Sequence, residues 1–331
     1  MDFTQFHVFF EKEPKYRLKQ AMEGLFRELA SNWQEAGYLP AALRQKLDKE
    51  FPIGIIAETF VSKDENTIKA LITLEDGFKI ETVLMRHENG RNTVCISSQV
   101  GCAMNCAFCA TGKLGFKRNL TIWEIIEQVL FFARYLKQSG EKISGVVFMG
   151  MGEPFLNYKN VMESIRILND EDGFNIGARH ISVSTSGTID GIEKLSREEI
   201  QINLAISLHA PDNGLRSKLM PINKTHPLEK ILNAVDNYIR ETHRRVMFEY
   251  VMIKDVNDSE ECAKKLAGLM KRRLYLVNLI SYNPTGIFEA SSTQKIKEFK
   301  EILEKEGVAV TQRYRFGQDI EGACGQLAAK N

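Results

Sequence analysis

The sequence contains no long hydrophobic run and no recognisable export signal. No apolar stretch among its 331 residues approaches the length of a membrane-spanning helix, so we expect no membrane partner. The first ten residues also lack the basic segment followed by an apolar segment that is typical of a secretory signal. These two absences predict a cytoplasmic protein whose cysteines stay reduced.

An excess of charge of one sign is also absent. The chain has 44 lysines and arginines against 43 aspartates and glutamates, so no long-range field attracts nucleic acid to the whole molecule. An RNA partner would therefore be held by local basic clusters, each of which could equally be a solvated face. The candidates are Lys113, Lys117 and Arg118, then Arg244 and Arg245, Lys271 with Arg272 and Arg273, and Arg313 with Arg315.

Six cysteines are too few to build a disulfide scaffold in a chain of this length. Three of them, Cys102, Cys106 and Cys109, have the spacing C-x3-C-x2-C in a loop after a predicted strand over 93–97. Three such thiolates can hold three irons of a [4Fe–4S] cluster and leave the fourth iron open. The alternative is a structural zinc site with Cys95 as fourth ligand, although zinc usually takes two close pairs of ligands.

Periodicity divides the chain into two parts. Up to about residue 90, helical spacing over 16–29 and 41–51 precedes strand-like runs over 54–62, 67–74 and 78–85, which together predict a small α+β unit. Beyond it, short apolar runs alternate with helical segments in about six βα units, too few for a complete eight-stranded barrel. We therefore predict an α/β fold built on a partial (β/α)6 barrel.

The helix that follows the cysteine loop has clear boundary signals. Thr121 is a candidate N-cap, and Glu124 stands three residues later as the partner in a capping box. Gly140 is a plausible stop. One apolar face is formed by Ile125, Ile126, Val129, Leu130, Ala133 and Leu136.

Five further motifs accompany the cysteine triplet along the chain. They are Ser97–Cys102, Phe148–Pro154, Ser184–Gly187, Ser207–Pro211 and Ala323–Leu327. The cysteine spacing resembles that of radical S-adenosylmethionine (SAM) enzymes. The full set is similar to the ribosomal and transfer RNA adenine-C2 methyltransferases, also called dual-specificity RNA methyltransferases. The resemblance implies a radical SAM core over 91–315, an N-terminal RNA-docking domain over 1–90, and a C-terminal loop over 316–331.

The same resemblance implies the cofactors and their ligands. A [4Fe–4S] cluster would be held by Cys102, Cys106 and Cys109, with SAM on the open iron and two SAM molecules used per turnover. From the residues alone, Gly152 could be an ordinary turn and His209 a structural histidine. The residues that the resemblance assigns to SAM are Gly152, Glu153, Ser184, Ser207, Leu208, His209 and Asn283.

The resemblance also assigns the chemistry. Cys324, flanked by small residues, is implied to carry the methyl group: one SAM methylates it, and a radical made from the second SAM activates that methyl group for addition to adenine C2 in 23S ribosomal RNA and transfer RNA. Cys95 is implied to release the product through a transient Cys95–Cys324 disulfide. Glu81 matches the family's candidate base, and whether Glu81 or Cys95 takes the C2 proton stays open. Cys262, on a predicted helix, is expected to be structural.

Three alternatives are retained. The sister family methylates adenine C8, and Pro154 with Ala210 and Pro211 favours the C2 branch over it. Another radical enzyme, such as an activase, has no need of the Cys95 and Cys324 pair. A zinc-stabilised, non-catalytic RNA-binding protein is the third. The expected partners are an RNA substrate and an electron-donor protein, and the chain is expected to be a monomer.

Overall fold

The structure is a computed structural model that describes residues 1–313 and 316–329. Its N-terminal part consists of the helices α1 (Phe3–Phe10), α2 (Lys15–Phe26) and α3 (Ala41–Glu50), with the short 3-10 helix η1 (Trp33–Glu35) between the last two. The Asp2 carboxylate caps α1 by accepting hydrogen bonds from the first-turn amides. Phe3, Phe6 and Phe10 lie on the buried side of α1.

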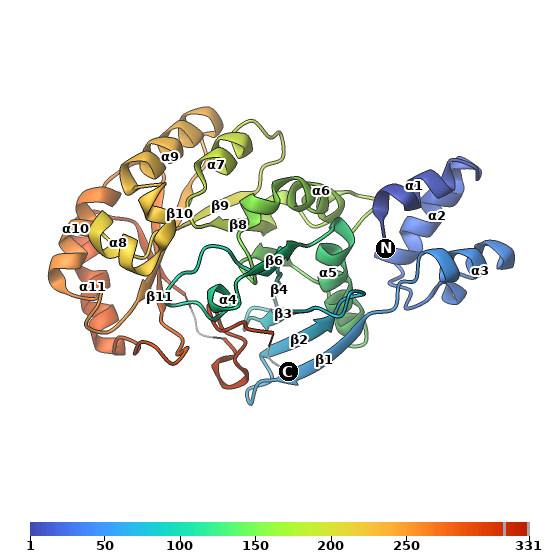
Figure 1. Ribbon diagram of the computed structural model, residues 1–331, viewed down its shortest axis with the longest axis horizontal. Coiled ribbons are helices and arrows are strands. Elements are labelled where there is room, and N and C mark those ends of the chain that lie inside the picture. The colour runs from blue at the N-terminus through green and yellow to red at the C-terminus, as the bar shows by residue number, and fades with distance from the viewer. Residues whose placement is uncertain (314–315, 330–331) are drawn as a thin grey trace.

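A single ten-stranded sheet runs through the molecule (Figure 1). Its first strands are β1 (Ile56–Val61), β2 (Thr67–Thr73), β3 (Lys79–Arg86) and β4 (Asn92–Cys95), and each neighbouring pair of them is antiparallel. From β4 onward every neighbouring pair is parallel. The strands of the predicted N-terminal unit therefore continue the sheet of the barrel. Whether residues 1–90 act as a separate RNA-docking domain stays a prediction.

Six parallel strands are each followed by at least one helix before the next parallel strand of the ten-stranded sheet begins. The strands are β4, β7 (Gly145–Phe148), β8 (Ile181–Thr185), β9 (Asn203–Ser207), β10 (Val246–Met252) and β11 (Tyr275–Ser281). The short β12 (Val310–Gln312) then pairs with β11 at the far edge. In the described part of the chain β1 and β12 are edge strands that do not pair with each other, so the sheet stays open. The predicted partial (β/α)6 barrel is confirmed.

The helices α5 to α11 lie outside the curved sheet (Figure 1). They are α5 (Ile122–Lys137), α6 (Tyr158–Asn169), α7 (Ile189–Leu195), α8 (Asn213–Leu219), α9 (Leu228–Thr242), α10 (Glu260–Met270) and α11 (Thr293–Lys305). Short 3-10 helices are η2 (Pro154–Asn157), η3 (Ala178–His180), η4 (Pro221–Lys224) and η5 (Gln318–Ile320). The predicted capping box of α5 is present with both of its hydrogen bonds, and its predicted apolar face is buried. No helix among the described residues is long and apolar enough to cross a membrane.

The cysteine loop leaves the sheet after β4. It contains the two-stranded sheet of β5 (Gln99–Gly101) and β6 (Phe116–Asn119), with the short helix α4 (Ala110–Lys113) between them. Gly101 has a φ of +71°, and a Cβ there would lie 1.8 Å from the Gly115 carbonyl oxygen, so only glycine fits this close approach. The C-terminal segment, red in Figure 1, runs back beside α4.

Candidate active site

The residues assigned to SAM gather at the carboxyl ends of the parallel strands. Ser184 and Ser207 end neighbouring strands, and their Oγ atoms lie 3.4 Å apart. Gly152 follows β7, and Asn283 follows β11. Because the carboxyl ends of parallel strands face one edge of a barrel, side chains far apart in sequence meet there.

Glu153 is buried, and its carboxylate holds two loops together. It accepts a hydrogen bond of 2.7 Å from the Ser186 amide and one of 3.2 Å from the Phe155 amide. Burial raises the pKa of Glu153, while these amide donors act in the opposite direction. Gly152 is required here, because its φ is +102° and a Cβ would lie 2.6 Å from Gln99 Cβ.

His209 lies between the cysteine loop and the carboxyl ends of the strands, where the residues assigned to SAM gather. Its Nδ1 accepts a hydrogen bond of 3.1 Å from the Val251 amide, and its ring meets Phe108 edge-on with 4.8 Å between centroids. Burial, followed by the nearby charge of Arg216, lowers the pKa of His209 to about 3. The imidazole is therefore neutral at physiological pH, with its Nε2 carrying the proton.

Arg216, on α8, is a site residue that the sequence analysis missed. Its side chain is fully buried and donates to the carbonyl oxygens of Ser186, Ser207 and Leu208. Burial lowers its pKa to about 10, and the nearby Cys106 acts in the opposite direction. Arg216 thus ties the ends of β8 and β9 together directly behind the residues assigned to SAM.

The three loop cysteines lie close enough to influence one another. Burial raises the pKa of Cys102 to about 12. Burial also raises the pKa of Cys106 well above its usual range, with Cys109 and Cys102 adding to the effect. Over residues 1–313 and 316–329 no three His, Cys, Asp or Glu side chains are close enough to share one metal ion. A cluster that takes one thiolate per iron would suit three separate cysteines, of which Cys102 and Cys106 are costly to ionise without metal.

The buried polar groups near the carboxyl ends of the strands also fit a polar ligand. Ser186 Oγ and Thr188 Oγ1, just beyond β8, are buried and have no hydrogen-bond partner among the described residues. Such groups usually find a partner in a folded protein. A bound amino acid or nucleoside would supply one. The side chains present therefore fit both groups, the cluster on soft sulfur donors and SAM on the polar strand ends.

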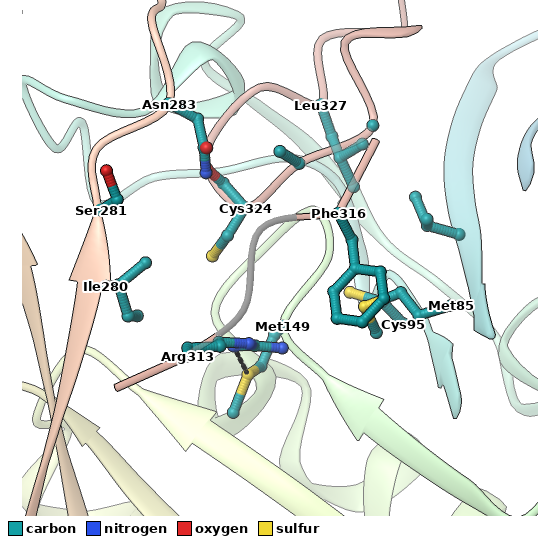
Figure 2. Close-up of a pocket in the computed structure, with 13 residues that line it drawn as sticks. Met85, Cys95, Met149, Ile280, Ser281, Asn283, Arg313, Phe316, Cys324 and Leu327 are labelled. Carbon is teal, nitrogen blue, oxygen red and sulfur yellow. Dashed lines mark hydrogen bonds between the residues drawn. The ribbon is translucent and has the colours of Figure 1, made fainter. Parts of the chain in front are cut away.

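Cys95 and Cys324 line one cavity, although they lie far apart in the sequence. Cys95 ends β4 in register with Val83 of β3 and Val147 of β7. Figure 2 shows the Cys324 sulfur pointing into the space that the Arg313 guanidinium enters. All six cysteines are free thiols, so the predicted Cys95–Cys324 disulfide is not formed in this state.

The C-terminal segment is held over this cavity by residues that the sequence analysis had assigned to other tasks. Glu81 Oε2 accepts hydrogen bonds from the Ala328 and Ala329 amides at 2.6 and 3.1 Å, while its Oε1 pairs with Lys69 Nζ at 3.0 Å. Asn283 Nδ2 donates to the Cys324 carbonyl at 3.0 Å. In this state Glu81 and Asn283 hold the segment that carries Cys324.

The cysteine loop holds the same segment from its other side. The Ala110 amide, next to Cys109, donates to the Gly325 carbonyl at 2.8 Å. Thr111 Oγ1 donates to the Leu327 carbonyl at 2.6 Å. The backbone that directly follows Cys324 is therefore linked to the loop that carries the three cysteines.

Most of the predicted basic clusters are engaged within the protein. Arg118 pairs with both Asp76 and Glu124. Lys271 pairs with Glu306, Arg272 with Asp236, and Arg244 donates to Asn203. Arg313 lies in the cavity with the two cysteines, and Arg315 lies outside the described residues. RNA contact by these clusters stays a prediction.

Comparison with known proteins agrees with this geometry. A model of the Radical SAM superfamily matches residues 96–266. A solved structure of a radical SAM methyltransferase from Sphaerobacter thermophilus superposes with a TM-score of 0.96 at 43% identity, over 100% of this chain and 98% of that one. The fold and the cysteine loop therefore define a radical SAM enzyme.

Curated relatives specify the family further. A protein of Dictyoglomus thermophilum named "Probable dual-specificity RNA methyltransferase RlmN" is 49% identical over 96% of this chain and 91% of its own length. One of Bacillus thuringiensis with the same name is 46% identical over 96% and 88%. The chain belongs to this RlmN family of radical SAM RNA methyltransferases, which confirms the resemblance found in its motifs. Membership implies a [4Fe–4S] cluster and SAM as cofactors.

Proposed function

We propose that this protein methylates C2 of adenine in 23S ribosomal RNA and in transfer RNA, with Cys324 as the methyl carrier and Cys95 as the thiol that releases the product. The observation that carries the proposal is the shared cavity of Cys95 and Cys324. It adjoins the cysteine loop through the hydrogen bonds of Ala110 and Thr111 to the C-terminal segment. A methyl carrier has to reach both the cofactor edge and a second thiol, and this segment lies between them.

The cofactors are assigned to the residues described above. Cys102, Cys106 and Cys109 would hold the [4Fe–4S] cluster. When bound, the cluster and SAM supply the electron and the radical that activate a methyl group. We propose two SAM molecules per turnover, one as methyl source and one as radical source. The proposed SAM contacts are Gly152, Glu153, Ser184, Ser207, Leu208, His209 and Asn283.

The side chains of this protein then perform three steps. The Cys324 thiolate attacks the SAM methyl carbon, and the electron pair of the broken sulfonium bond stays on the departing thioether. After the activated methyl carbon has bonded to adenine C2, a base removes the C2 proton, and the one unpaired electron left on the adenine ring would return to the bound cluster. Cys95 thiolate finally attacks the Cys324 sulfur, so that an S–S bond forms, the S–C bond to RNA breaks and the carbon takes a proton. An external dithiol reduces the disulfide for the next cycle.

The base is Glu81 or Cys95. Glu81 is buried and pairs with Lys69, and its other oxygen accepts the Ala328 and Ala329 amides. It can act on the C2 proton only after those amides leave it. We therefore propose that the C-terminal segment moves off Glu81 when RNA binds. An electron-donor protein, a monomeric state and a cytoplasmic location complete the proposal.

Nucleoside mass spectrometry tests the product. The anaerobically reconstituted enzyme is incubated with SAM, a reductant and protein-free ribosomal RNA or, separately, transfer RNA. The proposal predicts 2-methyladenosine in both RNAs, whereas 8-methyladenosine would assign the chain to the C8 chemistry. Purified protein that holds zinc and no sulfide would contradict the radical mechanism.

Cysteine variants test the assigned roles. Cys324→Ala is expected to abolish product and protein methylation, and Cys95→Ala is expected to accumulate a covalent RNA–protein adduct. Cys262→Ala, on α10, is the matched control and should keep normal turnover. Normal turnover by Cys324→Ala would refute the carrier role.

A further inference from the structure

The cavity of Cys95 and Cys324 contains one full positive charge. Its lining is otherwise uncharged, and among the described residues that form it Arg313 alone is charged. Arg313 directly follows β12, and its Nη1 donates to Met149 Sδ at 3.3 Å. This contact directs the guanidinium across the ends of the strands toward the two thiols (Figure 2).

The rest of the cavity disfavours an ionised thiol. Val83, Met85, Ile280, Phe316 and Leu327 form much of its wall. Burial raises the pKa of Cys95 to about 12, and the neighbouring Cys324 adds to this. Cys324 remains open to solvent, yet the surrounding protein raises its pKa as well. Both groups therefore rest protonated near neutral pH. Because a protonated thiol is a poor nucleophile, each needs a stabilising charge nearby when it ionises to react.

Charged groups around Cys324 act in both directions. The Arg313 guanidinium lowers the pKa of Cys324, whereas Glu249 and Cys109 raise it. Glu249, on β10, is buried and accepts a 2.9 Å hydrogen bond from Asn278 Nδ2. Arg313 also lowers the pKa of Cys95. The Met149 backbone also lowers the pKa of Cys95. Of the charged groups that act on the two thiols, Arg313 is the one that favours their ionised form.

We propose that Arg313 is a positioning residue that stabilises the thiolate of Cys324 as it forms for methylation and the thiolate of Cys95 as it forms for product release. The inference rests on the proposed roles of these two cysteines. Each thiol gives its proton to solvent, and the negative sulfur stays beside the guanidinium until it attacks. Arg313 keeps its own proton throughout, because a guanidinium is not deprotonated in proteins. Its charge is therefore available in both steps.

The first test measures the thiols directly. Anaerobic enzyme with its cluster intact is treated with iodoacetamide over a range of pH, and the rates at Cys324 and Cys95 are followed by peptide mass spectrometry on the unmethylated fraction. Arg313→Gln removes a nearby cation. It is therefore expected to slow alkylation of Cys324 and Cys95 on the order of tenfold near neutral pH, and to shift the pH dependence of both rates to higher pH. Arg313→Lys keeps the charge and should restore most of the rate. Cys262 is the internal reference and should not change.

The second test separates this inference from the proposed function. Transfer of a labelled methyl group from SAM to Cys324 should slow in Arg313→Gln and recover at higher pH. If wild-type Cys324 is never labelled, the carrier role fails, while the alkylation profile still reports on Arg313. Identical alkylation profiles for wild type and Arg313→Gln would overturn the inference. So would unchanged alkylation combined with weaker RNA binding, which would make Arg313 an RNA contact.

Discussion

Charged side chains inside this protein are stabilised in different ways. Lys69 and Glu81 form a buried pair, and Arg216 is satisfied by carbonyl oxygens rather than by a carboxylate. Glu127, on the buried face of α5, has neither arrangement among the described residues, although the N-terminal ammonium acts to lower its pKa. Burial, and then the like charge of Glu124, raises the pKa of Glu127 to about 7. Its ionised form is therefore costly in the folded state.

Because ionised Glu127 is costly in the folded state, the free energy of unfolding should depend on pH. Glu127→Gln should remove this dependence. Between the ordinary carboxyl pKa and about 7, the unfolded chain loses the Glu127 proton while the folded chain keeps it. Glu127 therefore weakens folding as pH rises through this window, by about 3 kcal/mol at most once it is complete. Thermal unfolding of Glu127→Gln should be shifted upward near pH 8 and much less near pH 5. Glu241→Gln, exposed at the end of α9, is the control and should differ little from wild type at either pH.

Sequence reasoning found the residues that stand in local motifs and missed those defined by distant partners. Cys102, Cys106 and Cys109 are recognisable from their spacing alone. Arg216 binds the carbonyls of Ser186, Ser207 and Leu208, and no spacing in the sequence records that arrangement. A carbonyl is present at every residue, so its use as a ligand leaves no pattern in the side chains.

Secondary-structure elements were predictable where their boundary signals were strong. The capping box of Thr121 and Glu124 fixed the start of α5, and the βα alternation predicted the barrel. The helix α1 was not predicted, because its eight residues are shorter than the window of about 11 to 18 residues in which helical spacing is recognised, and the apolar Val8 and Phe9 lie off the face of Phe3, Phe6 and Phe10. Its formation depends on Phe6 packing against Trp33 and Phe51, with centroids 5.9 and 5.3 Å apart, and these contacts are set by the tertiary structure.

The C-terminal segment is also shaped by tertiary contacts that its local sequence does not predict. Its sequence predicts a loop, and small residues around Cys324 suggest freedom to move. In the structure, several hydrogen bonds restrain it instead. The segment accepts hydrogen bonds from Thr111, Ala110 and Asn283, and it donates to Glu81. Since the proposed mechanism needs the segment to leave Glu81, these bonds set how readily it does so.

Thr111→Val tests that control. It keeps the shape of the side chain and removes the donor to the Leu327 carbonyl, a loss on the order of 1 kcal/mol. Amide hydrogen exchange over 324–329 should become several-fold faster, while exchange in β3 stays unchanged. Thr225→Val also removes a hydroxyl donor, to the Ile222 carbonyl, on the surface, and should leave the segment unaffected. Equal exchange over 324–329 in Thr111→Val and wild type would show that Thr111 does not restrain it.

At the scale of the whole molecule, the N-terminal helices are joined to the barrel through α5. Trp123 packs on Phe3 with 5.9 Å between centroids, and Lys137 Nζ donates to the Glu28 carbonyl at 2.6 Å. Arg134 donates to the Ile53 carbonyl at 2.9 Å and also to the Ala30 carbonyl. Because α5 also borders the cysteine loop, it links the proposed RNA-docking part to the site.

Arg134→Met should loosen this junction without altering the site. Its half-buried guanidinium serves two carbonyls in buried residues, and removing it leaves both without that donor, at a cost of about 2 kcal/mol. Hydrogen exchange in α1 to α3 is expected to accelerate on the order of tenfold, with SAM cleavage in the absence of RNA unchanged. Arg240→Met removes an exposed arginine whose guanidinium donates to Asn237 within α9, and it is the matched control. If the helices dock RNA, the affinity for RNA should fall in Arg134→Met and not in Arg240→Met. Unchanged hydrogen exchange in Arg134→Met would mean that packing around Phe3 and Trp123 holds the junction without Arg134.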